Sequence, residues 1–260
     1  MRTPKRACMM RASVVYASHL MSRTHVLALT ILALSSLNAA AQDAGSSNDR
    51  FSGKAALGYI STSGNTDSTS ANASLSLAWA LTAWSHAFEL SGIGASTDDQ
   101  TTAEAYLFKY EARRAFGEHG YLFTALDYKR DRFSGYAEQV SQTVGYGRRL
   151  IDRERHKLDA GVGFGARQSE LRDGTEEDDA IVRGSVDYFW TLSDTTEFEQ
   201  RLVVESGSTN TMTEARSALR ARIVGNVALV LSYRIKLNSS VPEGATNADR
   251  FTAISLEYAF

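Results

Sequence analysis

The sequence predicts an all-β protein: a single 12-stranded antiparallel transmembrane β-barrel preceded by a cleaved signal peptide. From residue 51 onward, apolar residues alternate with small or polar ones at period two. The alternating segments number twelve, and the connections between them are in turn long and short, as in barrels whose termini share one side of the membrane. Of the 260 residues 43% are hydrophobic, but no apolar run is long enough for a spanning helix, which excludes a helical membrane protein.

The first element is a signal peptide. Arg23 and His25 precede the apolar stretch 26–34, and the small residues Ala39–Ala41 supply an A-x-A cleavage site. The alternative interpretation of the apolar stretch is a buried core helix. The predicted organisation is a signal peptide of residues 1–41 with an over-long start, a short linker of residues 42–50 and a barrel of residues 51–260.

Removal of the signal peptide changes the charge balance. Residues 1–41 hold five of the 28 basic residues and none of the 30 acidic ones, which leaves a net charge of about −7 on the mature chain. The single cysteine, Cys8, is removed as well, so the exported chain must be held by packing or by a sheet without open edges. The acidic charge excludes nucleic acid as a partner, and no motif implies a cofactor.

Twelve segments with period-two alternation follow the linker. Segment 68–81 places its leucines and Trp79 on one face and small polar residues on the other, and the last segment alternates in the same way. Segment 213–223 also suits a helix, but the alternation of its three arginines with apolar residues favours a strand. The predicted strands are 51–61, 68–81, 84–96, 102–115, 120–132, 138–150, 156–169, 179–192, 195–206, 213–223, 226–238 and 250–260.

The connections differ in length according to their position. Those after odd-numbered strands are longer and polar, such as 170–178 and 239–249, whereas those after even-numbered strands are mostly tight, such as 82–83 and 193–194. Long outer loops and short periplasmic turns are typical of outer-membrane barrels, while a soluble sandwich has no reason to sort its loops in this way. A closed barrel also leaves no sheet edge unpaired in lipid.

Aromatic residues mark the predicted periplasmic side of the barrel. Trp79, Trp84 and Trp190 all fall at strand ends on that side, where amphipathic rings form a belt at the membrane–water interface. The alternative is that these residues are core aromatics of a soluble sandwich.

The last strand resembles the signal by which the barrel-assembly machinery recognises outer-membrane barrels. That resemblance implies the machinery as a partner during insertion. The residues of this terminal signal are Ile254, Leu256, Tyr258 and Phe260.

Residues 58–68, Gly-Tyr-Ile-Ser-Thr-Ser-Gly-Asn-Thr-Asp-Ser, resemble the salt-induced outer-membrane protein family, a domain family of unknown function. Residues 127–135, 145–152 and 161–167 continue the similarity, which covers about residues 51–260. The resemblance implies an outer-membrane barrel and supplies no catalytic residue and no established activity.

One face of the later strands carries charges of both signs and is predicted to line the lumen. In one interpretation the charges pair across neighbouring strands and occlude the barrel, because buried charges need partners. In the other, a basic stripe and an acidic stripe face each other across a water-filled lumen and orient small polar solutes. Twelve strands lie between filled eight-stranded and open sixteen-stranded barrels, so the strand number does not decide. The residues concerned are Glu197, Glu199, Glu205, Arg216, Arg220, Arg222, Arg234 and Lys236.

Features that would support catalysis are weak. His86, His119 and His156 are predicted at periplasmic strand ends or turns, whereas a protease at the outer mouth would need its histidine on the opposite rim. The acidic run 176–179 is predicted in an outer loop, where it would attract divalent cations shared with lipopolysaccharide. It lacks the spacing of an EF-hand, and a solvated loop is the favoured interpretation. No catalytic, metal or cofactor site is therefore predicted.

We expect an integral protein of the Gram-negative outer membrane without enzymatic activity, with a role in envelope integrity or in salt and osmotic stress. The first alternative is a narrow channel for small polar solutes, and the second is an outer-membrane hydrolase. The expected partners are outer-membrane lipid and lipopolysaccharide, and the sequence leaves the oligomeric state open.

Overall fold

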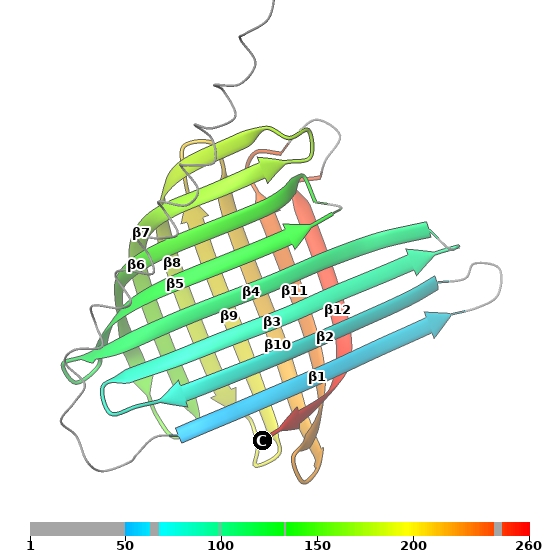
Figure 1. Cartoon of the computed structure of the whole chain (residues 1–260). Helices are drawn as coiled ribbons and strands as arrows, with labels where there is room; N and C mark the ends of the chain where they lie inside the picture. The colour runs from blue at the N-terminus through cyan, green and yellow to red at the C-terminus, as the bar shows by residue number, and fades with distance from the viewer. Residues whose placement is uncertain (1–49, 63–67, 99, 133, 242–245) are drawn as a thin grey trace, which may run out of the picture. The chain divides into compact units, whose positions relative to one another are not determined.

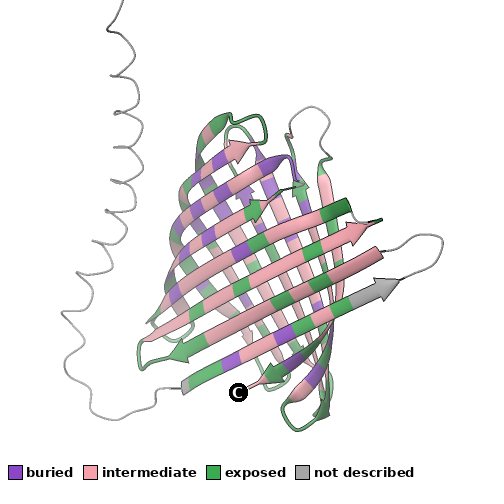
Figure 2. Ribbon diagram, turned by 45° about the vertical axis from the view of Figure 1, so that its right-hand side comes forward, coloured by how far each residue is buried: buried purple, intermediate pink, exposed green. Residues whose placement is uncertain are grey.

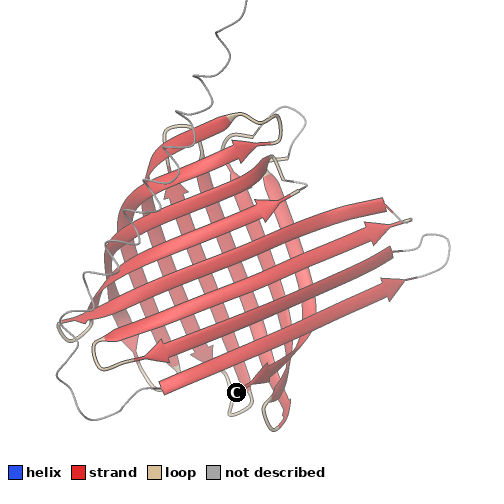
Figure 3. Ribbon diagram, viewed as in Figure 1, coloured by secondary structure: helices blue, strands red, loops and turns tan. Residues whose placement is uncertain are grey.

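Twelve antiparallel strands form one closed barrel in the computed structural model, which describes residues 50–62, 68–98, 100–132, 134–241 and 246–260. Each strand pairs with the next along the chain, and β12 returns to β1 (Figures 1 and 3). The predicted fold class is therefore confirmed. The strands are β1 (Arg50–Thr62), β2 (Ser68–Ala80), β3 (Trp84–Thr97), β4 (Gln100–Phe116), β5 (Gly120–Asp131), β6 (Tyr136–Asp152), β7 (His156–Leu171), β8 (Glu176–Thr191), β9 (Thr196–Ser206), β10 (Thr211–Val224), β11 (Val227–Asn238) and β12 (Ala248–Ala259).

Two features predicted near the N-terminus lie outside the described residues. They are the signal peptide of residues 1–41 and most of the predicted linker. The connection between β1 and β2, residues 63–67, lies outside them as well. The segment that also suited a helix is a strand, β10, as the alternation of its arginines predicted.

Degrees of exposure alternate along the strands (Figure 2), and the exposed outward face carries large apolar side chains whereas most of the buried inward ones are polar or charged. On β12, Ile254, Leu256 and Tyr258 are each about half exposed at the outward face, while Glu257 between them is buried. An apolar face of this kind suits lipid, because in water it would cost free energy in proportion to its area. No helix in the described parts of the chain has the length and hydropathy of a membrane span.

The strands extend further at the loop end than the sequence predicted. The connection expected at 170–178 is only 172–175, because the acidic run 176–179 pairs with β7 and belongs to β8. The connection between β3 and β4 is reduced to residues 98 and 99, and Asp98 adopts a positive φ of 48° there, which a short polar residue tolerates. The difference between long and short connections is therefore smaller than expected.

The seam between β1 and β12 closes the barrel over a short length. Register pairs join only Lys54–Leu57 to Leu256–Ala259, whereas β1 pairs with β2 from Arg50 to Thr62. We call the end of the barrel where β1 begins and β12 finishes the terminal end, and the opposite end the loop end. At the terminal end, Gly53 and Phe260 exchange backbone hydrogen bonds of 2.8 and 2.9 Å. A Cβ atom at Gly53 would lie 2.4 Å from the Phe260 ring, so a larger residue at this position would push the ring aside.

Burial inside the barrel is uneven. All residues of β2 and β3 are described, and none of them is buried. Buried polar and charged residues come instead from β5 to β12. The lumen is thus filled mainly from one side of the barrel.

Candidate functional site

Six inward side chains with compensating charges form what we call the lumen cluster: Lys109, Asp127, Lys129, Arg183, Glu205 and Glu214. The Arg183 guanidinium donates to the carboxylates of Asp127 at 2.6 Å and Glu205 at 2.7 Å, and these three residues are nearly inaccessible. Three cations and three anions balance one another, as buried charges require.

The second half of the lumen cluster is centred on Glu214. The Lys109 and Lys129 ammonium groups donate to its carboxylate at 2.9 and 3.2 Å. Lys109 Nζ also lies 4.0 Å from Asp127 Oδ1, which connects the two halves.

Three bonds of the lumen cluster cross the lumen, because they join strands that are not neighbours, whereas Arg183–Glu205 and Lys109–Asp127 join adjacent strands. Glu214 is on β10, whereas its partners Lys109 and Lys129 are on β4 and β5. Asp127 on β5 likewise meets Arg183 on β8. In a closed barrel, inward side chains of such strands meet only by reaching across the interior. The lumen cluster therefore divides the lumen.

A second buried network, the loop-end network, joins Arg167 on β7 and Asp179 on β8 to residues 208–210 in the loop between β9 and β10. Arg167 donates to Asp179 at 3.0 Å and to the carbonyl of Asn210, and all three residues are at most 5% exposed. The Asp179 carboxylate also accepts hydrogen bonds from the backbone N–H groups of Ser208 and Thr209, each at 3.2 Å. The loop between β9 and β10 is thus held against β8.

The acidic run expected in a solvated loop is divided by the strand alternation. Asp178 is exposed, whereas Asp179 is buried against Arg167. In the turn before it, the Thr175 amide donates to the Asp173 carboxylate at 2.9 Å and holds the pKa of this exposed group below its usual range. Among the described residues, no group of three His, Cys, Asp or Glu side chains is arranged to hold a metal ion.

We expect Asp179→Asn to weaken the loop-end network by about 2 kcal/mol, since a hydrogen bond to a charged group contributes about 1.5–3 kcal/mol. The measurement is hydrogen exchange of the Ser208 and Thr209 amides, which donate to this carboxylate and should lose protection. Asp178→Asn changes the exposed neighbour and should leave both amides protected. Equal exchange in the two variants would contradict the assignment.

At the terminal end of the barrel the lumen contains ion pairs but is not filled by them. Arg113 on β4 donates to Asp159 and Asp187 at 3.1 and 3.3 Å, again between strands that are not neighbours. A cavity of about 330 Å³ lies beside small inward residues of β1 to β3, and another of about 290 Å³ lies at the rim beside Lys54 and Arg222. This half of the barrel has room for small solutes.

The eight charges predicted to line the lumen do not form two opposed stripes. The acidic ones are on β9 and three basic ones are on its neighbour β10, so Arg220 pairs with Glu197 at 3.2 Å as well as with Glu257 on β12 at 2.7 Å. Glu205 belongs to the lumen cluster, while Glu199 and Arg222 line the two cavities.

The remaining predicted charges reach other strands. Arg216 crosses the lumen to Glu89 on β3 at 3.0 Å. Lys236 donates to Gln139 on β6 at 3.2 Å, and the Arg234 guanidinium lies 5.4 Å from the centre of the Phe251 ring. The pairing thus runs both between neighbouring strands and across the lumen.

Several residues that close the lumen were not among those predicted. Asp127 and Lys129 alternate in the predicted strand 120–132, and Glu214 shares a face with Arg216, so the same parity rule could have found them. Asp179 begins the predicted strand 179–192 and shares a face with Arg183, so the same rule could have placed it inward, although the acidic run 176–179 was assigned to a loop.

The three tryptophans lie on the outward face at the terminal end of their strands. Trp79 packs on Phe51 with ring centroids 4.9 Å apart, and Trp190 stacks on His156 at 5.6 Å. The Arg114 guanidinium lies 5.8 Å from the Trp84 ring centre. Rings with an apolar body and a polar edge suit a membrane–water boundary.

The histidines of the strands share this outward position. His86 Nδ1 lies 3.0 Å from the Tyr110 hydroxyl, and His156 Nδ1 lies 2.8 Å from the Tyr188 hydroxyl. Each imidazole is thus engaged by a tyrosine on the same face. His119 lies in the turn between β4 and β5.

Comparison with known proteins identifies relatives over almost the whole barrel. The family described as "Protein of unknown function, DUF481" matches residues 55–260. The uncharacterized protein YdiY of Escherichia coli strain K12 is 32% identical over 235 residues, covering 86% of this chain and 92% of the relative.

Among solved structures, an outer-membrane channel from Pseudomonas putida F1 has a TM-score of 0.48 at 11% identity, covering 85% of this chain and 98% of that one. The NanC porin has a TM-score of 0.47 at 11% identity, covering 79% and 97%. The translocator domain of the autotransporter NalP from Neisseria meningitidis has a TM-score of 0.44 at 12% identity, covering 96% and 100%.

Proposed function

We propose that this chain, which belongs to the DUF481 family of proteins of unknown function, is a closed barrel of the Gram-negative outer membrane. Its role in this proposal is to support the integrity of the envelope. In this proposal it conducts no solute at rest and catalyses no reaction. The lumen cluster carries the proposal, because Glu214 on β10 is bonded to Lys109 and Lys129 on β4 and β5, which lie on the opposite side of the interior. Ions that crossed would have to break several buried pairs at once.

The outward face supports the location in the outer membrane. Its large apolar side chains are exposed along all the strands, with the tryptophans Trp79, Trp84 and Trp190 gathered at one end. The terminal signal at Ile254, Leu256, Tyr258 and Phe260 would be read by the barrel-assembly machinery. Lipid and lipopolysaccharide are then the partners of this face.

A role under salt or osmotic stress is consistent with where the charges lie. Salt screens exposed ion pairs strongly and buried ones much less. A barrel closed by buried pairs should therefore stay folded and closed when the ionic strength outside changes. Such a barrel would add protein to the envelope without adding a leak.

Conductance in planar bilayers tests the closure. We expect the wild-type protein to give low or undetectable current. We expect Lys109→Ser/Lys129→Ser/Glu214→Ser to give discrete current steps, because the triple change removes the two ion pairs that join β4 and β5 to β10 across the lumen. Glu104→Ser/Arg132→Ser removes an ion pair of 3.1 Å outside the lumen cluster and should stay silent. Large steady steps from the wild type would refute the closed barrel.

That refuting result would favour the second candidate, a narrow channel for small polar solutes. The observation behind this candidate is the cavity of about 330 Å³ in the terminal half, whose lining includes Lys54, Glu89, Arg201 and Arg216. Charges of both signs around such a space would orient a zwitterion.

A further inference from the structure

The barrel wall is incomplete in the loop-side half of the seam between β1 and β12. Pairing between the two strands ends at Leu57 and Leu256. Beyond that point β1 still pairs with β2 as far as Thr62, and β12 still pairs with β11 back to Ala248. The gap is therefore confined to the seam, where two backbone edges diverge without joining (Figure 1).

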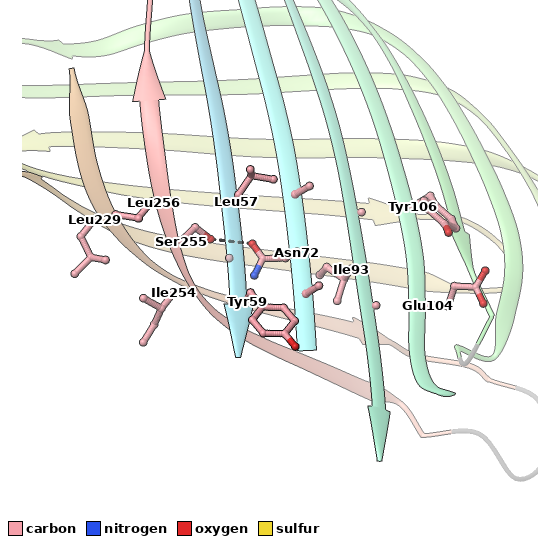
Figure 4. A pocket seen from close by; sticks show the side chains of 15 residues that line it. Leu57, Tyr59, Asn72, Ile93, Glu104, Tyr106, Leu229, Ile254, Ser255 and Leu256 are labelled. Carbon is pink, nitrogen blue, oxygen red and sulfur yellow. Dashed lines mark hydrogen bonds between the residues drawn. The ribbon is translucent and has the colours of Figure 1, made fainter. Parts of the chain in front are cut away.

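A groove of about 780 Å³, the seam groove, occupies this position (Figure 4). Outward side chains such as Leu57, Tyr59 and Leu256 line it, and so do inward ones such as Asn72 and Ser255. Register pairing between β1 and β12 ends at Leu57 and Leu256, so this part of the seam groove lies where the wall is open, and the rest of it lies over the paired strands β2 and β3.

The floor of the seam groove is polar. Ser255 Oγ on β12 donates to Asn72 Oδ1 on β2 at 2.8 Å, the bond dashed in Figure 4. Between them, a Cβ atom at Gly58 of β1 would lie 2.3 Å from the Ile254 carbonyl oxygen, so glycine permits this close crossing. Strands that pair lie about 4.7–4.9 Å apart, so no added strand fits between β1 and β12 here.

The sides of the seam groove are apolar and open outward. Leu57 and Tyr59 are 70% and 69% exposed, and Leu256 is 56% exposed. The seam groove continues over β2 and β3, where the outward positions are the small residues Ala71, Ala73, Gly92 and Gly94.

We propose that the seam groove binds one lipid of the surrounding bilayer. An acyl chain lies along the apolar sides, and polar groups of the lipid meet the diverging backbone edges and the Asn72–Ser255 floor. Irregular backbone at membrane depth persists only beside protein or polar groups, and an amphiphile supplies such groups at the place where apolar chains also arrive. The volume falls within the range of about 300–1,000 Å³ typical of ligand sites. The site rests on the proposed location in the outer membrane, but it does not depend on whether the lumen conducts.

Photo-crosslinking of the whole protein tests the site. The probe is a phosphatidylethanolamine with a diazirine on its acyl chain, in vesicles of phosphatidylethanolamine and phosphatidylglycerol. We expect labelled peptides to come from β1 to β3 and β12 several-fold more than from β6 to β8. Gly94→Leu should lower that labelling several-fold, because its new side chain enters the groove and a Cβ there meets nothing within 4 Å.

Gly184→Leu is the matched control. Gly184 has equally open surroundings but lies on β8, away from the seam, and its replacement should leave the labelling unchanged. Heat-modifiable migration on gels reports folding, and Ala73→Leu, at an exposed position in the same groove, replaces Gly94→Leu if that variant does not fold. Even labelling around the barrel, or equal loss of labelling in the groove and control variants, would overturn the proposal.

Discussion

Replacement of Arg183 by methionine is expected to lower the free energy of unfolding by about 3–5 kcal/mol, because it leaves two buried carboxylates without their shared cation. Asp127 and Glu205 both accept hydrogen bonds from this guanidinium, and Glu205 is only 1% exposed. Methionine is long enough to occupy much of the same space, so the loss reports mainly the charge and its hydrogen bonds.

Reversible unfolding in urea, followed by tryptophan fluorescence of the protein in lipid vesicles, measures this loss. Arg132→Met is the control, because the Arg132 side chain is 69% exposed and its ion pair with Glu104 contributes at most about 1 kcal/mol. Adding Glu205→Gln to Arg183→Met should recover at least half of the lost stability, since two cations then face two anions and Asp127 keeps Lys109 as a partner at 4.0 Å. If Arg183→Met lowers the free energy of unfolding no more than Arg132→Met does, the lumen cluster does not stabilise the barrel.

Gly53→Val is expected to lower the fraction of molecules that close the barrel, at a cost of about 1–3 kcal/mol for a side chain placed in occupied space. The added side chain would overlap the Phe260 ring, which lies 2.4 Å from a Cβ at this position. The ring can turn about its side-chain torsions without breaking the two backbone hydrogen bonds between Gly53 and Phe260, but it then loses its contact with the Phe51 ring, whose centroid lies 6.3 Å away. The seam has few other pairs to compensate, because β1 and β12 pair over only four further residues each.

The fraction of protein that migrates as the compact, heat-modifiable form in isolated membranes measures closure. Gly184→Val places the same side chain in open surroundings on β8 and should close normally. Gly53→Ala should be intermediate, since its single methyl group overlaps the ring less. Equal amounts of compact protein in Gly53→Val and Gly184→Val would contradict the role of Gly53 at the seam.

Prediction from sequence was reliable for the strands and their faces. Period-two alternation is a local property, so segments such as 226–238 and 250–260 needed no knowledge of their neighbours. The loop-side ends were less reliable, because β7 and β8 continue into the predicted loop through pairing that starts at Glu170 and Glu176. Pairing of this kind depends on register, which alternation does not specify beyond the two faces.

The candidate site was predicted only in part. Inward parity placed Arg216 and Arg220 in the lumen, but not Glu89 as the partner of the first or Glu257 as a partner of the second. A bond between β3 and β10 depends on how far apart opposite walls stand, and this distance is a property of the closed cross-section. The seam groove was not foreseen for the same reason, since it depends on where β12 diverges from β1.

The sequence by itself determined the number of strands, the apolar outward face and the ionic character of the interior, because each depends on alternation along one strand and on the need to satisfy backbone groups in lipid. Only the tertiary structure decided which charges meet across the lumen, which half of the lumen remains hollow and where the wall opens at the seam. These depend on distances between strands far apart in the chain, and closure of the sheet sets those distances.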